Sequence, residues 1–200
     1  MAGVFFRTKS LWDGSSILVA AVLPKSAKNS KTGALAQVYI LPDNGKLPHV
    51  AWKDGDYDSV CGDCPHKDNG ACYVDRTKGS RGVMVGIRNG KSYREVTVEG
   101  FRDALAGLAV RWGADGDPAM IPEAEFRVIA SQVTSCTGYT HQWRWAHWLK
   151  GHCMACDGNL RGERRANPVI IAHGLAHKVT KYKTFRMSLA LHDRSGSNYA

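Results

Sequence analysis

The stretch CGDCPHKDNGACY, residues 61–73, constrains this chain more than any other feature of the sequence. It places Cys61, Cys64 and Cys72 at C-x2-C-x7-C spacing, with a proline directly after the second cysteine. Thiolates are preferred ligands of zinc and of iron–sulfur clusters, and a two-residue spacer lets both sulfurs reach one centre. We therefore predict that these cysteines bind an iron–sulfur cluster, with Zn²⁺ as the alternative. The alternative is that all three are buried, inert thiols with no metal-binding or catalytic role.

A fourth ligand must come from another part of the chain. The candidates are His66, Cys136, Cys153 and Cys156. Of these we predict Cys153, which forms a second C-x2-C pair with Cys156. This pair could also complete a four-thiolate zinc site with Cys61 and Cys64, act as a redox dithiol, or supply small apolar residues.

Length and composition indicate an ordinary globular chain. The 200 residues suit one domain, and 44% hydrophobic with 22% charged residues argues against disorder. No apolar run approaches the ~18 residues of a membrane span, and no export signal is recognisable at the N-terminus. We expect a soluble, cytoplasmic protein without a membrane partner. In a reducing cytosol, paired C-x2-C motifs favour metal or redox chemistry over disulfides.

The charge balance suggests a polyanionic partner. The net charge is +9 and the sequence pI is about 9.4, which is common among proteins that bind nucleic acid. Several basic residues follow the second cysteine pair: Arg161, Arg164, Arg165, Lys178, Lys181, Lys183 and Arg186. We therefore expect nucleic acid or a nucleotide as the partner. A solvated, solubilising face is the simpler interpretation.

Strand patterns and helix patterns alternate along the chain. The apolar run 17–23 has the length of a strand, and AQVYIL at 36–41 is β-rich and closed by turn residues. Residues 83–86 could form a short strand or a loop edge. From Val98 onward, apolar residues recur at helical spacing, and 108–113 then indicates a buried strand.

A second helix and a further strand follow. Pro122, with acidic residues just after it, marks a helix N-terminus, and we expect this helix to reach about Gln132. The segment 135–143 begins like a strand and becomes loop-like at Gly138. Three later apolar runs are HCMACD, VIIAHG and TFRMSL.

This alternation predicts one α/β domain over residues 1–200, with the cysteine-rich loop 61–73 inside it. The sheet would be either an incomplete (β/α) barrel or an open, mainly parallel sheet. Polar residues follow the expected strands: Asp115, Asp117, Tyr139, His141, Cys153, Cys156, Asp157 and His173. Because the carboxyl ends of parallel strands meet at one edge, we expect these side chains to form a site there.

The candidate catalytic residues are Asp117, Tyr139 and His141. Histidine transfers protons near neutral pH, and Gly138 would permit close approach of a ligand to the backbone. The alternative for His141 is a hydrogen-bonded histidine packed under the tryptophans.

The segment THQWRWAHW is dense in aromatic rings. Trp143, Trp145 and Trp148, with Arg144, could stack on bases, although we expect at least one of these rings to belong to the core. The pair His173 and His177 lacks the glutamate of a zincin motif, and neither a P-loop nor a dinucleotide-binding glycine motif is present.

Six motifs occur in a fixed order over residues 29–187: NSKTGALAQVYIL, CGDCPHKDNGACYV, VRWGADGDPAMIP, CTGYTHQW, CMACD and KTFRM. In this order they resemble an uncharacterised family of proteins found mostly in bacteriophages. More loosely, the layout is similar to phage gene-product-88-like proteins and to the barrel of radical SAM enzymes. The resemblance implies a phage-type accessory protein in a bacterial host cell, with a barrel-like α/β core and a cysteine-bound metal.

The resemblance also draws attention to particular residues. They are Cys61, Cys64, Cys72, Arg111, Asp115, Asp117, Tyr139, Thr140, His141 and Gln142. Among them we assign Arg111 and Asp115 to cofactor binding. Radical SAM enzymes use C-x3-C-x2-C, whereas this chain has C-x2-C-x7-C, so cleavage of S-adenosylmethionine does not follow from the resemblance.

Overall fold

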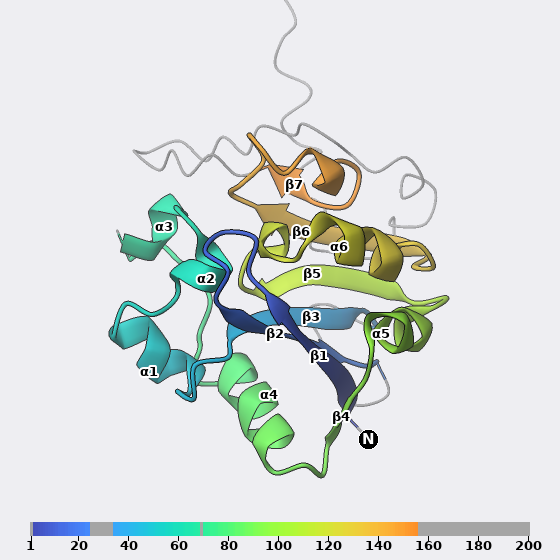
Figure 1. Ribbon diagram of the computed structural model, residues 1–200, viewed down its shortest axis with the longest axis horizontal. Helices are drawn as coiled ribbons and strands as arrows, with labels where there is room; N and C mark the ends of the chain where they lie inside the picture. The colour runs from blue at the N-terminus through green and yellow to red at the C-terminus, as the bar shows by residue number, and fades with distance from the viewer. Residues whose placement is uncertain (1, 25–33, 69, 156–200) are drawn as a thin grey trace, which may run out of the picture.

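A computed structural model describes residues 2–24, 34–68 and 70–155 (Figure 1). Its centre is a seven-stranded sheet with the strand order β4-β1-β2-β3-β5-β6-β7. The strands are β1 (Gly3–Lys9), β2 (Ser16–Val22), β3 (Ala36–Pro42), β4 (Tyr93–Glu95), β5 (Ala109–Asp115), β6 (Ser135–Thr140) and β7 (Met154–Ala155). The helices are α1 (Pro48–Lys53), α2 (Asp58–Cys61), α3 (Pro65–Asp68), α4 (Gly79–Arg88), α5 (Val98–Leu105), α6 (Glu123–Ala130), and the 3₁₀ turns η1 (Pro118–Met120) and η2 (His147–Leu149).

The predicted α/β class is confirmed, and the sheet is mainly parallel. The pairs β1–β4, β3–β5, β5–β6 and β6–β7 are parallel, whereas β2 pairs antiparallel with both β1 and β3. Over the described residues the sheet is open, with β4 and β7 at its edges. Of the two predicted architectures, the open sheet is therefore the one observed.

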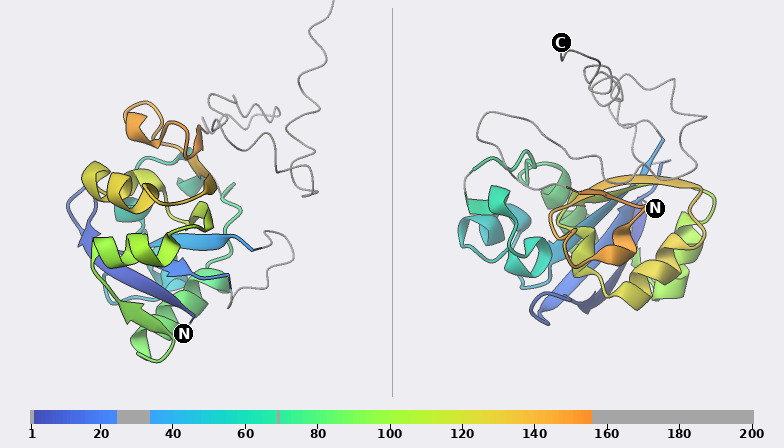
Figure 2. Two further views of the ribbon diagram at one scale, coloured as in Figure 1. Left: turned by 90° about the vertical axis from the view of Figure 1, so that its right-hand side faces the viewer. Right: turned by 90° about the horizontal axis from the view of Figure 1, so that it is seen from above.

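Helices cover both faces of the sheet (Figures 1 and 2). One face packs on α4, where Val83, Met84 and Ile87 meet Phe5 and apolar residues of the central strands. The other face packs on α5 and α6, whose buried residues belong to the larger core cluster. Consecutive residues such as Phe5 and Phe6 therefore serve opposite faces, as the pleat of a strand requires.

Both alternatives for residues 83–86, a short strand or a loop edge, are wrong, because these residues lie in the middle of α4. Glycines hide the helical period here, and two of them pack closely against tyrosine side chains. A Cβ at Gly79 would lie 3.0 Å from the Tyr39 hydroxyl, and one at Gly86 would lie 2.8 Å from the Tyr93 ring. The helix thus lies close to the tyrosines because it lacks side chains at these points.

The two predicted helices are confirmed. The side chain of Thr97 caps α5 by accepting a hydrogen bond from the Gly100 N–H at 3.1 Å, and Phe101 and Leu105 are buried beneath it. Helix α6 begins directly after Pro122 and ends at Ala130, close to the expected end.

The carboxyl ends of β3 and β5 form a topological switch point. The chain leaving β3 reaches α4 on one face, whereas the chain leaving β5 reaches α6 on the other face. Ligands of open α/β sheets bind at such points, outside the carboxyl ends of the strands. Helices α1 to α3 lie beyond this edge (Figures 1 and 2), and the Asp117 N–H donates to the Val60 carbonyl of α2 at 2.7 Å.

Several sequence predictions lie outside the described residues. They concern Cys156, Asp157, His173, His177, the basic residues from Arg161 to Arg186 and the runs 169–174 and 184–189. None of the helices in the described part of the chain has the length and apolar character that a membrane crossing requires.

Candidate functional site

Asp115, the last residue of β5, is fully buried at the switch point. Its carboxylate lies 3.3 Å from Arg76 Nη2, accepts a hydrogen bond from the Tyr57 hydroxyl at 3.0 Å, and accepts another from the Gly116 N–H at 3.0 Å. Burial raises the pKa of Asp115 above its usual value, and the Arg76 charge opposes this shift. Asp115 and Arg76 thus form a buried ion pair at the edge of the sheet.

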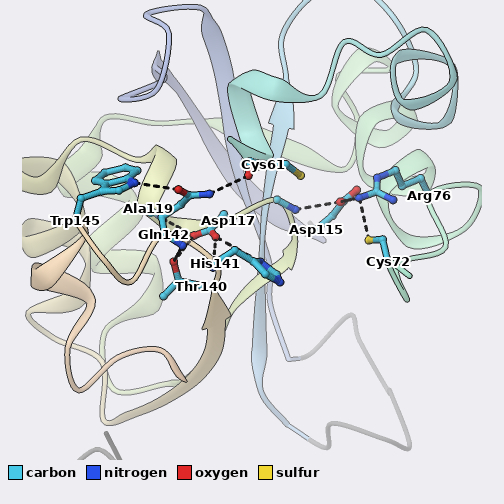
Figure 3. A network of polar contacts seen from close by, with 11 residues as sticks. Cys61, Cys72, Arg76, Asp115, Asp117, Ala119, Thr140, His141, Gln142 and Trp145 are labelled. Carbon is cyan, nitrogen blue, oxygen red and sulfur yellow. Dashed lines mark hydrogen bonds and ion pairs between the residues drawn. The ribbon is translucent and has the colours of Figure 1, made fainter. Parts of the chain in front are cut away.

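Arg76 connects this ion pair to the cysteine loop (Figure 3). Its guanidinium carbon lies 3.6 Å from the ring centre of Trp52 and 4.6 Å from that of Tyr57. Arg76 Nη2 also lies 3.4 Å from the Cys72 sulfur. The planar cation is therefore held by aromatic faces while its edge contacts both a carboxylate and a thiol.

The loop cysteines differ in their surroundings. Cys61, the last residue of α2, and Cys64 are both buried in the larger core cluster, whereas Cys72 is half-buried beside Arg76. Between the first two, Gly62 has φ 56° and ψ −138°, a conformation that favours glycine and turns the chain sharply. Burial raises the pKa of the Cys61 thiol well above its usual range.

The fit of a metal to these cysteines rests on donor type. Three thiols are the donors that zinc and iron–sulfur clusters prefer. Within residues 2–24, 34–68 and 70–155, no three Cys, His, Asp or Glu side chains converge as a ready metal site. The metal role of Cys61, Cys64 and Cys72 remains a prediction.

Cys153, the predicted fourth ligand, is buried against β6. A Cβ at Gly138 would lie 3.1 Å from its sulfur and 2.9 Å from Trp112 Cβ and from the Trp112 carbonyl oxygen. Burial raises the pKa of the Cys153 thiol well above its usual range. Gly138 therefore makes room for Trp112 and Cys153 in the core.

Asp117 forms a second polar centre at the same edge (Figure 3). Its Oδ1 accepts from the Thr140 hydroxyl at 2.8 Å and from the Ala119 N–H at 2.9 Å, and its Oδ2 accepts from the His141 N–H at 2.7 Å. The carboxylate thereby caps η1 and holds the end of β6 against the end of β5. This arrangement favours a positioning role for Asp117.

His141 lies next to this carboxylate. Its Nδ1 is 3.7 Å from Asp117 Oδ2, and its ring meets the His66 ring edge to face, with centres 5.1 Å apart. Burial and then His141 lower the pKa of His66. Two of the three candidate catalytic residues, Asp117 and His141, are thus brought together, and His66 of the cysteine loop joins them.

The side chain of Tyr139 lies on the opposite face of the sheet from Gly138 and Thr140. Its neighbours in β6, Gly138 and Thr140, are buried, whereas Tyr139 is 43% exposed. Arg111 lies on the same face, because it pairs with Thr137, two residues before Tyr139. Arg111 Nη2 lies 3.4 Å from the hydroxyl of Tyr73, which belongs to the cysteine loop.

Gln142 connects the cysteine loop to the tryptophan segment. Its Nε2 donates to the Cys61 carbonyl at 3.2 Å, and its Oε1 accepts from Trp145 Nε1 at 2.9 Å. Trp145 and Trp148 pack on the core, as expected for at least one ring. Trp143 is exposed, with the Arg144 guanidinium 4.8 Å from its ring centre.

Sequence reasoning did not identify Arg76, Tyr57 and Trp52 as site residues. They belong to no motif, and they meet only because the chain from α1 to α4 folds back over the ends of β3 and β5. The only available signal was an arginine four residues after Cys72. No protein-family model, curated protein or solved structure matches the chain.

Proposed function

We propose that the protein holds an iron–sulfur cluster, or another thiolate-bound metal, through Cys61, Cys64 and Cys72, and that it binds or acts on a nucleotide or nucleic acid. The observation that carries the proposal is the position of the cysteine loop. It lies over the carboxyl ends of β3 and β5, where its Cys72 contacts Arg76, the partner of Asp115. This edge is where open α/β sheets place their ligands.

The surroundings of the thiols support a metal role. Arg76, held by two aromatic rings, already contacts Cys72. Its positive charge lowers the pKa of the Cys61 thiol, in opposition to burial and Asp115, which raise it. Hydrogen bonds and charges around ligand sulfurs tune a cluster's potential. When bound, a cluster would supply electron transfer.

Rings and arginines near the loop support a nucleic-acid partner. Tyr73 is 68% exposed, contacts Arg111, and stands near the sheet face that also presents Tyr139. Exposed rings stack on bases, and arginines contact phosphates or add cation–π attraction. The net charge of +9 acts in the same direction.

A zinc-stabilised, non-catalytic module is the second candidate. Cys61 and Cys64 belong to the core cluster, so a metal bound by them would fasten α2 to the rest of the fold. Structural zinc binding is coupled to folding free energy. Chelation would then lower the melting temperature sharply.

Anaerobic purification distinguishes these candidates. A cluster protein should be brown, with broad absorbance in the blue part of the visible spectrum that bleaches on exposure to air. A colourless protein with stoichiometric zinc would support the structural module and contradict the cluster. A colourless, metal-free preparation that folds and melts normally would contradict both.

Nucleic-acid binding is tested separately with a fluorescent single-stranded oligonucleotide. The dissociation constant should rise steeply with salt, and Arg111→Gln should weaken binding and reduce the salt slope by about one. Arg81→Gln, on the exposed side of α4, is the matched control and should change the affinity less. Equal, small effects of both substitutions would remove Arg111 from the proposed interface.

A further inference from the structure

An open hollow of about 560 Å³ lies between the β1–β2 turn, the start of α6 and η2. Its lining consists of Leu11, Trp12, Glu123, Trp145 and Trp148. The β1–β2 turn stands beside α6 in Figure 1. Close to this turn, Thr8 of β1 donates a hydrogen bond to Glu125 of α6 at 2.9 Å. Three indole rings and one carboxylate therefore face a single space large enough for a small organic ligand.

The walls of the hollow are held by hydrogen bonds outside it. Trp145 Nε1 donates to Gln142 at 2.9 Å, and the Trp145 and Trp148 rings are tilted by 57° with centres 5.6 Å apart. On the opposite side, the Leu11 N–H donates to the Met120 carbonyl at 2.9 Å. The site is therefore largely formed before any ligand arrives, which lowers the entropic cost of binding.

The lining favours a ligand with a positive charge, because it consists of indole rings, one leucine and one carboxylate. Indole faces carry negative potential and attract cations. Arg127 Nε and Nη2 lie 2.8 and 2.7 Å from Glu123 Oε1, and because the Arg127 side chain is 64% exposed, solvent weakens this ion pair and leaves Glu123 able to attract a second cation. Glu123 and Glu125 are both in the first turn of α6, where they already complement the helix dipole and would repel an anion.

The lining has few hydrogen-bond acceptors, and this favours cations that carry no N–H donors. A bare ammonium carries three N–H donors and a guanidinium five, and each donor that turns toward the lining loses water and needs a partner there. The hollow offers one carboxylate among apolar and aromatic atoms. A fully methylated ammonium has no N–H to satisfy and presents a diffuse positive surface to the rings.

We infer that this hollow binds a quaternary, methylated ammonium group. The inference does not rest on the metal and nucleic-acid proposals, because none of the lining residues belongs to the cysteine loop or to the surface of Tyr73, Arg111 and Tyr139 proposed for nucleic acid. Choline is the probe, and 3,3-dimethyl-1-butanol, which has the same shape without the charge, is its control.

Choline should shift the indole N–H signals of Trp12, Trp145 and Trp148 in a saturable manner in a ¹H–¹⁵N spectrum of the full chain. The signals of Trp52 and Trp112, which lie elsewhere in the fold, should stay in place. The neutral alcohol should bind at least about tenfold more weakly, given the strength of a desolvated cation–π contact. Equal shifts with both probes, or none with choline, would overturn the inference.

Two variants assign the effect to the lining. Trp12→Ala removes an exposed ring with little risk to the core and should weaken choline binding about fivefold. Glu123→Gln keeps the shape, removes the charge and should weaken choline but leave the alcohol unchanged. Trp143→Ala, an exposed indole outside the hollow, is the matched control. Unchanged choline affinity in both lining variants would contradict the assignment.

Discussion

Asp117 connects η1, the end of β6 and α2 through its side chain and its backbone N–H. Its carboxylate receives donors from η1, from β6 and from the residue after β6, and its backbone N–H is bonded to α2. Asp117 is only 4% exposed, so solvent does not reach the groups that donate hydrogen bonds to its carboxylate and cannot take its place as their acceptor. Its main contribution should therefore be to the stability and geometry of the site.

Asp117→Ala should lower the free energy of unfolding by about 3 kcal/mol, because two buried donors and one part-buried donor lose their acceptor. Asp117→Asn keeps one acceptor oxygen and should cost about half as much. Urea denaturation of the wild type and both variants measures the difference. An unchanged transition in Asp117→Ala would show that the carboxylate is not a structural centre.

At this scale the sequence showed some site residues and concealed others. The cysteines and Asp117 belong to recognisable motifs, and Asp117 and His141 meet as expected at the strand ends. Tyr139 lies within β6, where the alternation of side chains places it on the opposite face from Gly138 and Thr140. Arg76 could not be found, because its importance arises from the fold that brings Trp52 and Asp115 to it.

At the scale of elements, strands β2, β3 and β5 could be predicted because each is a short apolar or β-rich run. Helix α5 could be predicted from the helical spacing of its apolar residues, and α6 from Pro122 and the acidic residues after it. Helix α4 could not be predicted, because glycines interrupt the apolar pattern at the positions where the helix packs against Tyr39 and Tyr93. Strand β1 also escaped notice, and its two adjacent phenylalanines serve opposite faces of the sheet.

The close packing of the turn after β5 can be tested by substituting Gly116. It has φ 76°, and a Cβ there would lie 2.3 Å from the Ile40 carbonyl oxygen. Gly116→Ala should cost about 3 kcal/mol or more, from backbone strain plus overpacking. Gly107→Ala is the matched control, with φ 72° and nothing within 4 Å, and it should cost only about 1–2 kcal/mol. Thermal unfolding compares the two, and equal losses would show that the contact with Ile40 yields easily.

Strand β4 gives the fold a sensitivity to alkaline pH. Burial, with a smaller contribution from Tyr39, raises the pKa of Tyr93 to about 12, whereas an unfolded tyrosine titrates near 10. Between these values the unfolded chain releases a proton that the folded chain retains, so stability falls as the pH rises. Because the ring is partly exposed, we expect a loss on the order of 1 kcal/mol by pH 11.

Tyr93→Phe removes this loss. The variant and the wild type should have similar urea midpoints at pH 7, and the variant should be the more stable of the two at pH 11. Tyr39 and Tyr57, whose pKa values burial also raises, titrate in both proteins and cancel in the comparison. A difference that does not change with pH would contradict the assignment to Tyr93.

At the scale of the whole molecule, alternation of strands and helices predicted the α/β class but not the topology. The choice between a barrel and an open sheet depends on long-range pairing, such as that of β4 with β1 and of β2 between β1 and β3. Local periodicity carries no information on these neighbours. The topology matters for function because it places the cysteine loop at the switch point.

The most direct test of the account is the metal content of protein purified without oxygen, measured in parallel for the wild type, Cys61→Ser, Cys64→Ser and Cys136→Ser. Serine is a poor substitute for a thiolate ligand. The control Cys136 is a buried thiol on β6, 3.5 Å from His152 Nδ1. We predict stoichiometric iron and acid-labile sulfide in the wild type and in Cys136→Ser, and loss of both in the two loop variants. Full metal content in Cys61→Ser and Cys64→Ser, or a wild type without bound metal, would contradict the central claim.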